Sequence, residues 1–410
     1  MYELIIRLYA LGVAIASLFN PKARKMLRGG HDTLKTLAGR IDRGSRYAWF
    51  HAASLGEFEQ GRPIIERLRA EHPEYKILLT FFSPSGYEVR KDYKGADIVC
   101  YLPLDTRRNA RRFIEAVRPA VVFFIKYEFW WNYLSLLKTA EIPTYSVSSI
   151  FRRDQVFFKW YAHHYAKVLR CFTRFFVQND ESRQLLAGIG ITDVDVTGDT
   201  RFDRVLQIKQ AAKSLPLVDA FTGDAKVFVA GSSWPQDEDI FIRYFNGHPG
   251  WKLIIAPHVI SEEHLQKIEE HLKCTSVRYT EATEENVVAA DCLIIDCFGL
   301  LSSIYGHADV AYVGGGFGVG IHNLLEAAVW GVPVIFGPNN ARFQEAQELK
   351  ACGGGLEVSS YEDFMVLMNK FNASSHAVTA AGLEAANYVN GKAGATDAVL
   401  NAVGPLLDRP

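Results

Sequence analysis

Short apolar runs alternate with amphipathic runs from Arg46 through most of the remaining chain. The apolar runs have the length and composition of buried strands, whereas the runs between them have helical periodicity. We expect strands at residues 47–51, 76–82, 98–102, 121–125, 144–148, 175–177, 226–230, 252–256, 292–295, 310–313 and 332–336. This alternation is typical of parallel α/β architecture.

The alternation falls into two cycles, which predicts two domains. The helical run after Phe202 ends near residues 214–216, and a new strand-like run starts at Lys226. A chain of 410 residues is also too long for one comfortable hydrophobic core. We expect a membrane-interface segment at 1–30, an N-terminal α/β domain at 31–215 and a C-terminal α/β domain at 216–410. Two such domains facing a cleft would bind two substrates at the carboxyl ends of their strands.

The composition excludes several classes of protein. Hydrophobic residues make up 49% of the chain and charged residues 22%, which describes a folded protein. A formal net charge of -1 argues against a nucleic-acid partner, because such proteins carry a basic excess. The 6 cysteines form no C-x-x-C pair, so we expect buried, reduced thiols. Asp193 and Asp195 have the D-x-D spacing of metal-dependent glycosyltransferases but share one face of a strand-like run, so we expect no metal.

The first 30 residues carry a signal of their own. Residues 1–19 are largely apolar, interrupted by Glu3 and Arg7, and a basic run follows at Lys22, Arg24, Lys25 and Arg28. A signal peptide has its charge before the apolar stretch, and the uninterrupted stretch here is short of the roughly 20 residues that cross a bilayer. The pattern favours a helix in the membrane interface, with its basic run against anionic headgroups. The alternative is a helix buried on its own domain.

A glycine turn in the second domain separates two apolar runs. Residues 313–316 read Val-Gly-Gly-Gly and include Gly314 and Gly315, and a helix is expected to begin near His322. Glycines permit close approach of a ligand, and a helix N-terminus offers N–H groups to an anion. Glu326 could accept hydrogen bonds from two ribose hydroxyls. The segment therefore fits a nucleotide, and the alternative is an ordinary crossover whose glycines serve packing alone.

Polar residues also follow other strand-like runs. In the first domain, Ser54 and Gly56 suit a turn, which leaves Glu57 to act as a general base or, alternatively, to cap a helix. Glu128 stands beside tryptophans, a pattern typical of a sugar platform or, alternatively, of plain core packing. Arg201 could supply a fixed positive charge.

In the second domain, small hydroxyls and a histidine occupy equivalent positions. Ser232 and Ser233 follow the first strand-like run and suit a phosphate. Pro257 and His258 follow the next run, where the histidine could contact a phosphate or act as a base, although a lone histidine is more often structural.

In this order, the motifs resemble those of the 3-deoxy-D-manno-octulosonic acid (Kdo) transferases of lipopolysaccharide synthesis, glycosyltransferases with two Rossmann-like domains (GT-B type). The resemblance covers nearly the whole chain. It rests on the apolar and basic N-terminus and on residues 54–57, 80–86, 128–130, 198–203, 314–315 and 322–326. It implies an inverting enzyme that moves Kdo from CMP-Kdo to a lipid A precursor without a cofactor, at the cytoplasmic face of the inner membrane.

The resemblance also implies roles for particular residues. Glu57 would be the catalytic base, and Arg201 would balance charge. Ser54, Gly56 and Glu128 would contact the acceptor. CMP would be bound by the C-terminal domain through Pro257, His258, Phe298, Gly299, Leu300, Leu301, Asn323, Leu324, Leu325 and Glu326.

The chain departs from the family pattern at several of these positions. Lys126 stands where an acid is usual, so no role transfers to it. His258 follows Pro257 directly, without the usual arginine between them. Arg201 replaces a lysine, and Leu300 replaces a common glutamate.

Two other classes of function fit the same pattern. One is a different GT-B enzyme, such as a UDP-sugar transferase or an epimerase. The other is a non-catalytic, membrane-docked protein that binds a nucleotide sugar.

Overall fold

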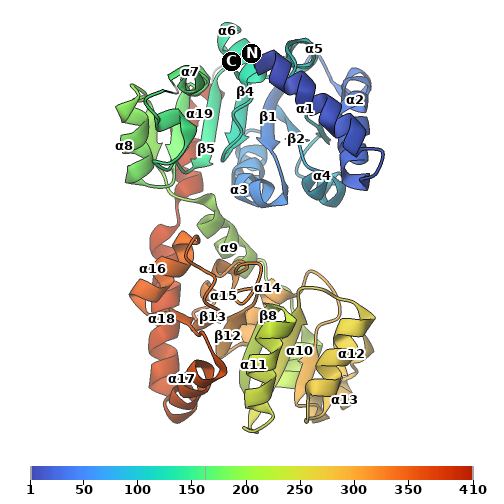
Figure 1. The fold of residues 1–410 in the computed structure, drawn as a ribbon, viewed down its shortest axis with the longest axis vertical. Helices are drawn as coiled ribbons and strands as arrows, with labels where there is room; N and C mark the ends of the chain where they lie inside the picture. Colours follow the sequence, from blue (N-terminus) through green and yellow to red (C-terminus); the bar gives the residue numbers. More distant parts are fainter. Residues whose placement is uncertain (1, 162, 409–410) are drawn as a thin grey trace. The chain divides into compact units, whose positions relative to one another are not determined.

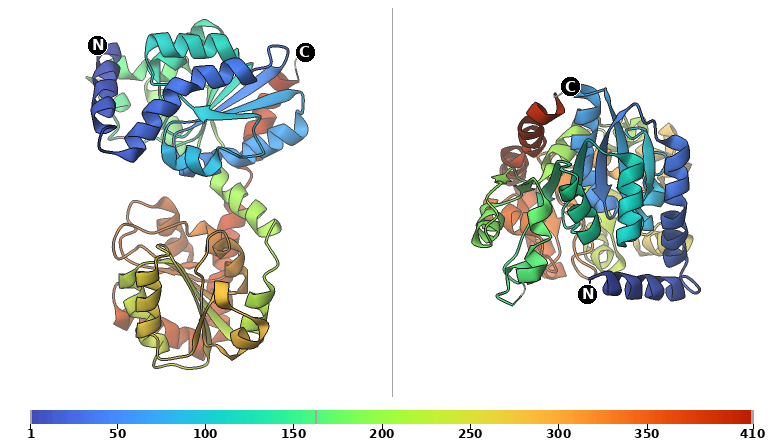
Figure 2. Two further views of the ribbon diagram at one scale, coloured as in Figure 1. Left: turned by 90° about the vertical axis from the view of Figure 1, so that its right-hand side faces the viewer. Right: turned by 90° about the horizontal axis from the view of Figure 1, so that it is seen from above.

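The apolar runs become the strands of two parallel sheets in the computed structural model, which describes residues 2–161 and 163–408 (Figures 1 and 2). The chain forms two compact units. The N-terminal unit comprises Met1–Arg204 together with Ala393–Pro410, and the C-terminal unit comprises Val205–Lys392. Each unit has its own sheet of seven strands, and the predicted α/β class is confirmed.

The sheet of the N-terminal unit has the strand order β3-β2-β1-β4-β5-β6-β7. Its strands are β1 (Arg46–Ala52), β2 (Tyr75–Phe81), β3 (Ile98–Tyr101), β4 (Val121–Ile125), β5 (Thr144–Ser149), β6 (Arg174–Val177) and β7 (Val194–Val196). All neighbouring strands run parallel. The order reverses between β1 and β4, and ligands of open α/β sheets bind at the carboxyl ends of strands beside such a reversal.

The helices of this unit cover both faces of its sheet. They are α1 (Tyr2–Ala16), α2 (Pro21–Arg40), α3 (Leu55–Glu71), α4 (Pro84–Arg90), α5 (Arg107–Val117), α6 (Trp131–Thr139), α7 (His163–Ala166), α8 (Asp180–Gly188), α9 (Thr200–Gln210) and α19 (Ala395–Leu407), with 3-10 turns at Val156–Phe158 and Leu169–Cys171. Side chains of β1 alternate between the two faces: Trp49 packs in one core cluster, and Phe50 packs with α3 in the other.

The N-terminal segment forms two helices. Asn20 separates them, and its side chain accepts hydrogen bonds from the amides of Lys22 and Ala23, which starts α2 at Pro21. Helix α1 buries Ile6 and Val13. Exposed apolar side chains line its opposite side at Leu4, Leu8, Leu11 and Ile15, and the exposed Leu18 follows the helix. Among the described residues, no helix has the combined length and apolar character needed to cross a membrane.

The last helix corrects the expected domain division. Residues 393–410 were expected in the C-terminal domain, but α19 belongs to the N-terminal unit. Its Val399 and Val403 are buried in the core cluster that contains Phe58 of α3. Asp203 also accepts hydrogen bonds from the amides of Gly394 and Thr396, both at 2.6 Å. The division also lies earlier than expected near 215: it falls after Arg204, within α9, whose residues from Val205 to Gln210 belong to the C-terminal unit.

The sheet of the C-terminal unit has the strand order β10-β11-β9-β8-β12-β13-β14. Its strands are β8 (Lys226–Ser233), β9 (Trp251–Pro257), β10 (Ser276–Arg278), β11 (Cys292–Ile294), β12 (Val310–Val313), β13 (Val334–Phe336) and β14 (Gly355–Glu357). Its helices are α10 (Pro216–Thr222), α11 (Pro235–Phe245), α12 (Glu262–His271), α13 (Glu284–Ala289), α14 (Leu301–Ile304), α15 (Leu325–Ala328), α16 (Gln344–Cys352), α17 (Tyr361–Ala373) and α18 (Ser375–Lys392), with 3-10 turns at Tyr279–Glu281 and Tyr305–His307. The order reverses between β8 and β12.

The cysteines are free, as expected, but they are not all buried. Cys100, Cys171 and Cys292 are buried, whereas Cys274 is exposed. Asp195, from the D-x-D run, forms an ion pair of 3.2 Å with Arg174 on the neighbouring strand. This contact gives the carboxylate a structural partner.

Candidate active site

The expected base, Glu57, and the expected acceptor residues lie at the strand-order reversal of the N-terminal sheet. Ser54, Gly56 and Glu57 follow β1, and Glu128 follows β4. Because β1 and β4 are parallel neighbours, both segments leave the same edge of the sheet. Topology therefore brings together residues that are about seventy positions apart in the sequence.

Glu57 lies in the first turn of α3, with Ser54 as the N-cap residue. The Ser54 hydroxyl donates a hydrogen bond to Oε2 of Glu57, and no side-chain capping bond joins Ser54 to the helix backbone. The half-buried carboxylate is thus held through one oxygen. Among the described residues, no donor occupies its Oε1, which can accept a proton.

A buried histidine holds the second carboxylate. Oε2 of Glu128 accepts hydrogen bonds from Nε1 of Trp130, at 2.6 Å, and from Nε2 of His51, at 3.2 Å. Nδ1 of His51 lies 2.9 Å from the hydroxyl of Thr80, which also accepts from Trp49 at 2.8 Å. Because Nε2 of His51 faces a carboxylate oxygen, the hydrogen bond to Glu128 requires a proton on Nε2. His51 was not predicted as a site residue, because a lone histidine on a buried strand has no distinguishing signal.

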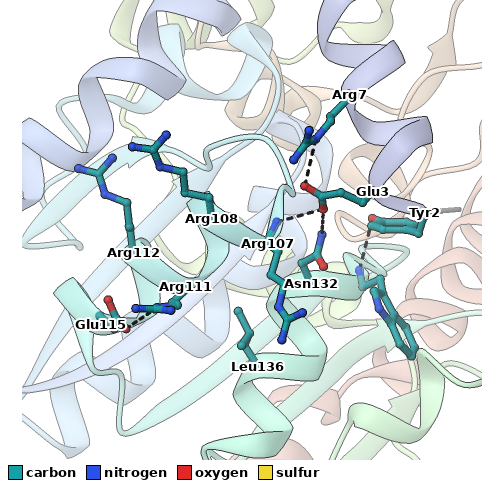
Figure 3. A pocket seen from close by; sticks show the side chains of 11 residues that line it. Tyr2, Glu3, Arg7, Arg107, Arg108, Arg111, Arg112, Glu115, Asn132 and Leu136 are labelled. Atoms are coloured by element: carbon teal, nitrogen blue, oxygen red, sulfur yellow. Dashed lines mark hydrogen bonds and ion pairs between the residues drawn. The ribbon is translucent and has the colours of Figure 1, made fainter.

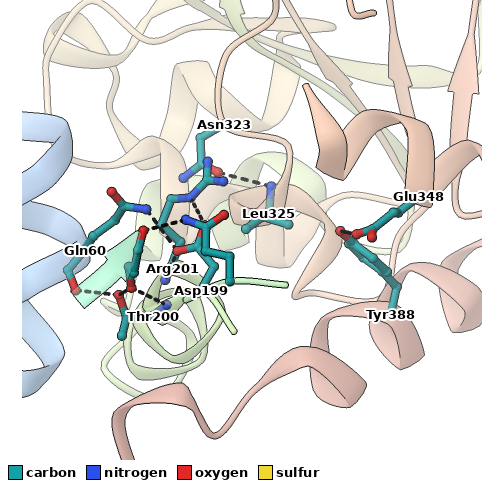
Figure 4. A network of polar contacts seen from close by, with 10 residues as sticks. Gln60, Asp199, Thr200, Arg201, Asn323, Leu325, Glu348 and Tyr388 are labelled. Atoms are coloured by element: carbon teal, nitrogen blue, oxygen red, sulfur yellow. Dashed lines mark hydrogen bonds and ion pairs between the residues drawn. The ribbon is translucent and has the colours of Figure 1, made fainter. Parts of the chain in front are cut away.

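Arg201 begins at the same edge of the sheet and is anchored by Asp199. Its Nε donates to Asp199 at 2.8 Å, and Nε2 of Gln60 donates to the same carboxylate at 3.0 Å (Figure 4). Asp199 is buried, so these bonds fix the guanidinium at the start of α9. Arg201 is therefore a positioned cation, as its expected role requires.

The expected donor residues lie at the strand-order reversal of the C-terminal sheet. Ser232 and Ser233 end β8, and Gly314 and Gly315 follow β12. A side chain on Gly314 would meet the carbonyl oxygen of Ser232 at 2.4 Å, so only glycine fits there. Gly315 has φ +93, in the left-handed region that favours glycine.

A buried carboxylate holds the glycine turn in place. Asp237 accepts hydrogen bonds from the amide of Gly315, at 2.9 Å, and from the hydroxyl of Tyr312, at 2.8 Å. Burial raises the pKa of Asp237. The amides of Gly314, Gly318, Gly320 and His322 also bond within the turn or to β8. Five backbone amides of the turn are therefore already hydrogen-bonded within the protein. No pattern in the sequence predicted these bonds.

The helix after the turn begins later than expected. It starts at Leu325 instead of near His322, and it spans four residues. Asn323 accounts for the difference: its Oδ1 accepts from the amide of Leu325 at 3.3 Å, and its Nδ2 donates to Glu326 at 2.9 Å. The amide of Leu325, at the start of the helix, is thus already hydrogen-bonded. The Asn323–Glu326 pair lies at the same end of the helix. Leu324 and Leu325 are buried and serve packing.

Three aromatic rings stack at the ends of β8, β9 and β12. His258 lies between Trp234, at 4.9 Å, and His322, at 4.3 Å, with both ring pairs nearly parallel. Nε1 of Trp234 donates to Nε2 of His322 at 3.2 Å. Burial and the neighbouring His258 lower the pKa of His322 to about 4, so His322 is neutral at physiological pH. His258 is exposed and follows the buried Pro257.

Ser233 differs from a phosphate ligand in one respect. Its buried hydroxyl donates a hydrogen bond to Glu238 at 2.8 Å, so the hydroxyl proton of Ser233 is not available to a phosphate. Glu238 also contacts Nε2 of His264 at 2.8 Å, and Nδ1 of His264 contacts the carbonyl oxygen of Val259 at 2.8 Å. Burial raises the pKa of Glu238. Ser232, with φ +53, remains the better-placed serine.

The remaining donor segment, 298–301, follows β11. Phe298 is 81% exposed and Gly299 has φ +86. Leu300 precedes α14, and Leu301 begins it. The turn thus presents an unpacked aromatic ring beside a strand end.

Backbone strain marks the same strand ends. Lys126, Ser148 and Ser232 have positive φ at the carboxyl ends of β4, β5 and β8. Such strain in non-glycine residues clusters at functional sites. No sequence pattern predicts it, because these residue types rarely adopt that conformation. No group of three or more metal-ligating side chains is present in the described ranges.

Comparison with known proteins agrees with these motifs. Residues 30–204 match a family model described as 3-deoxy-D-manno-octulosonic-acid transferase (kdotransferase). The 3-deoxy-D-manno-octulosonic acid transferase of Aquifex aeolicus is 29% identical over 331 residues, covering 78% of this chain and 85% of that protein. That of Chlamydophila psittaci is 27% identical over 322 residues, covering 75% and 73%. The resemblance to the Kdo transferase family is confirmed.

Solved structures with the same fold extend the comparison beyond the Kdo transferases. The UDP-GlcNAc 2-epimerase of Neisseria meningitidis has a TM-score of 0.57 at 13% identity, covering 88% of this chain and all of that one. The MurG protein of Acinetobacter baumannii has a TM-score of 0.56 at 11% identity, covering 88% and 99%. At these identities the likeness concerns the fold alone, and the fold is of the GT-B type. Residues 54–57 and 322–326, on which the resemblance rests, lie at the two strand-order reversals of this fold.

Proposed function

We propose that this protein is an inverting glycosyltransferase that moves Kdo from CMP-Kdo to a lipid A precursor in lipopolysaccharide synthesis. The observation that carries the proposal is Glu57, a carboxylate held by Ser54 at the β1–β4 reversal, within the range that matches the Kdo transferase model. Similarity to the curated Kdo transferases over three quarters of the chain supports the substrate class.

Glu57 acts as the general base in this proposal. It removes the proton from the attacking hydroxyl of the acceptor as that oxygen bonds to the anomeric carbon of Kdo. The bond from this carbon to the CMP phosphate breaks, and its electron pair leaves with CMP. Attack on the face opposite CMP inverts the configuration. The Ser54 hydroxyl fixes one carboxylate oxygen, so the other is aimed and available.

The donor is held by the C-terminal unit. Asn323 and Glu326 bind the ribose hydroxyls, and the exposed ring of His258 contacts the nucleotide. CMP carries a single phosphate, so its departure requires less charge compensation than that of a diphosphate. In the C-terminal unit, Ser232 at the end of β8 contributes to this compensation, and no metal is required.

The acceptor contacts Glu128, and the membrane supplies it. Oε2 of Glu128 is used by His51 and Trp130, which leaves Oε1 to accept a hydrogen bond from a sugar hydroxyl. The exposed apolar row of α1 supports docking at the cytoplasmic face of the inner membrane. Such docking brings a water-soluble donor to a lipid-borne acceptor.

A donor comparison tests this function. Purified protein and a detergent-dispersed lipid A precursor are given CMP-Kdo or a UDP-hexose, and free nucleotide is measured. We expect CMP to be released only when the acceptor is present, and no UDP to be released. Acceptor-dependent release of UDP, or release from neither donor, would overturn the proposal in favour of another GT-B enzyme or a binding protein.

A further inference from the structure

The N-terminal unit contains an arginine-rich cavity that the proposed mechanism does not use. This cavity of about 930 Å³, the arginine pocket, lies among the first turn of α1, the outer face of α5 and the start of α6 (Figure 3). Its charged lining consists of Arg7, Arg107, Arg108, Arg111, Arg112, Glu3 and Glu115. Five arginines against two glutamates leave three positive charges in a chain whose formal net charge is -1.

Internal partners satisfy only part of this charge. Arg111 pairs with Glu115 at 2.9 Å, and Arg7 lies 3.5 Å from Glu3. Within the described part of the chain, the guanidinium groups of Arg107, Arg108 and Arg112 have no ion-pair partner. The α5 arginines also form like-charge pairs one helical turn apart, which destabilises a helix unless an anion offsets the repulsion. Each guanidinium group is planar and can bind a phosphate bidentately, so a cluster of arginines suits a phosphate.

An apolar cavity adjoins the arginine pocket and shares Arg112 with it. This cavity of about 270 Å³ lies between α1, α2 and the ends of β2 and β3. Its apolar lining consists of Val13, Met26, Leu27, Leu34, Phe82, Leu102 and Leu104. A phosphate on the arginines and a hydrocarbon chain in the apolar cavity together describe a phosphorylated acyl lipid.

Lining residues of both cavities neighbour Trp130, which is bonded to the expected acceptor residue Glu128. Trp131 and Asn132, which line the arginine pocket, directly follow Trp130, whose indole donates to Glu128. Phe82, which lines the apolar cavity, packs against Trp130 at 4.8 Å between ring centroids. The two cavities thus approach the carboxylate to which an acceptor hydroxyl is assigned.

We infer that the arginine pocket and the adjoining apolar cavity bind a phosphate group and an acyl chain of the lipid acceptor. This inference rests on the proposed transfer to a phosphorylated acyl lipid. Arg108 and Arg112 hold a phosphomonoester of the acceptor, the apolar cavity takes part of one chain, and the sugar hydroxyl reaches Glu128.

The first measurement is the acceptor KM in detergent, with a phosphorylated acceptor and with the same acceptor after removal of its phosphate. We expect the wild-type KM to be about tenfold lower for the phosphorylated acceptor, as loss of a charge-assisted contact implies. The double variant Arg108→Gln/Arg112→Gln should lose this discrimination while its kcat stays near wild type. The matched variant Arg43→Gln/Lys91→Gln removes two exposed cations outside the pocket, and it should still discriminate between the two acceptors. A wild type that does not discriminate, or an Arg108/Arg112 variant that still does, overturns the inference.

A second measurement separates this inference from the proposed function. Flotation compares vesicles that contain phosphatidic acid with charge-matched vesicles that contain phosphatidylglycerol, and it needs no turnover. We expect tighter binding to phosphatidic acid, a preference that the Arg108/Arg112 variant loses. If the preference is present but the acceptor KM does not change, the pocket binds bulk lipid and the acceptor assignment is wrong. If wild-type protein prefers phosphatidic acid but transfers no Kdo to any acceptor, the proposed function fails instead.

Discussion

Glu57 is the residue on which the proposed chemistry depends most. It occupies a helix start, where a carboxylate usually serves as a cap, yet its bond is to the Ser54 hydroxyl. Its neighbour across the strand-order reversal, Glu128, is bonded by a buried histidine and a tryptophan. The two carboxylates therefore have different environments, which suits one for proton transfer and the other for binding.

Glu57→Gln should reduce turnover about 10²-fold or more, because the amide keeps the shape but cannot accept the proton. Its CMP affinity should change little. Steady-state kinetics and calorimetry measure the two effects separately. Glu71→Gln, at the far end of the same helix, should keep wild-type turnover. A Glu57→Gln enzyme with near-normal turnover would remove this residue from the chemistry.

Glu326→Ala should weaken CMP binding about tenfold or more, because it removes the ribose ligand that Asn323 orients. Calorimetric titration with CMP measures the change. Glu362→Ala, on the exposed side of α17, provides the control. An unchanged affinity would mean that the Asn323–Glu326 pair only caps the short helix α15.

At the scale of elements, the first turn of α1 is fixed by a buried carboxyl group. Asp105 accepts from the Tyr2 hydroxyl at 2.6 Å and from the amides of Asn132 and Tyr133 at the start of α6. Glu3 also accepts from the amide of Arg107 at 3.2 Å. Helix α1 is therefore attached by polar contacts at its beginning while its apolar row remains exposed.

The burial of Asp105 predicts a pH dependence of the protein's stability. Burial raises the pKa of Asp105 from 3.8 to about 7, so the folded protein retains a proton that the unfolded chain releases. The contribution of this proton to the free energy of unfolding is fully present below about pH 4. It is lost as the pH rises through about 7, at about 1.36 kcal/mol per pKa unit. Urea denaturation across this range measures it. Asp105→Asn cannot titrate and should lack this component; identical pH slopes in both proteins would contradict the assignment.

The elements also show how far the sequence determines the fold. The eleven expected strands all form, because long apolar runs with helical runs between them have one favourable arrangement, the parallel sheet. Three further strands, β7, β10 and β14, are three-residue edge strands without a long apolar run. The sequence indicated β7 only as the strand-like run around Asp193 and Asp195, and it gave no signal for β10 and β14. The place of α19 could not be read either, because its apolar face would suit either sheet and only the contacts of Asp203 and Val399 decide it.

Some features of the candidate site could likewise be predicted from the sequence, and others could not. Strand-end positions place Glu57, Glu128, Gly314 and Glu326 at the two reversals, as the alternation of strands and helices requires. The proton on His51, the closure of the glycine turn by Asp237 and the late start of α15 depend on contacts between distant segments. Such contacts leave no local pattern in a single sequence.

For the whole molecule, association with the membrane combines the apolar row of α1 with nearby basic residues. The structure modifies the expected basic run. Arg24 donates to the carbonyl oxygens of Ser17 and Leu18, and Lys25 pairs with Glu88 at 3.1 Å. Lys22 and Arg28 are exposed and, among the described residues, have no ion-pair partner. They are the charges best able to face anionic headgroups.

Lys22→Gln/Arg28→Gln should weaken binding to anionic vesicles roughly thirtyfold, since each cation near such a surface contributes about 1 kcal/mol. Moderate salt should also weaken the binding of the wild-type protein to these vesicles. Vesicle flotation measures both effects, and turnover on a detergent-dispersed acceptor should persist. Binding that responds neither to salt nor to these charges would contradict the interfacial arrangement.

The transfer reaction itself provides the most direct test. Purified protein is incubated with CMP-Kdo and a lipid A precursor, and the lipid product is analysed by mass spectrometry, with Glu57→Gln in parallel. We predict that the wild type adds the mass of at least one Kdo residue to the acceptor and that the variant adds little or none in the same time. An acceptor of unchanged mass in the presence of folded, CMP-binding wild-type protein would contradict the proposed function.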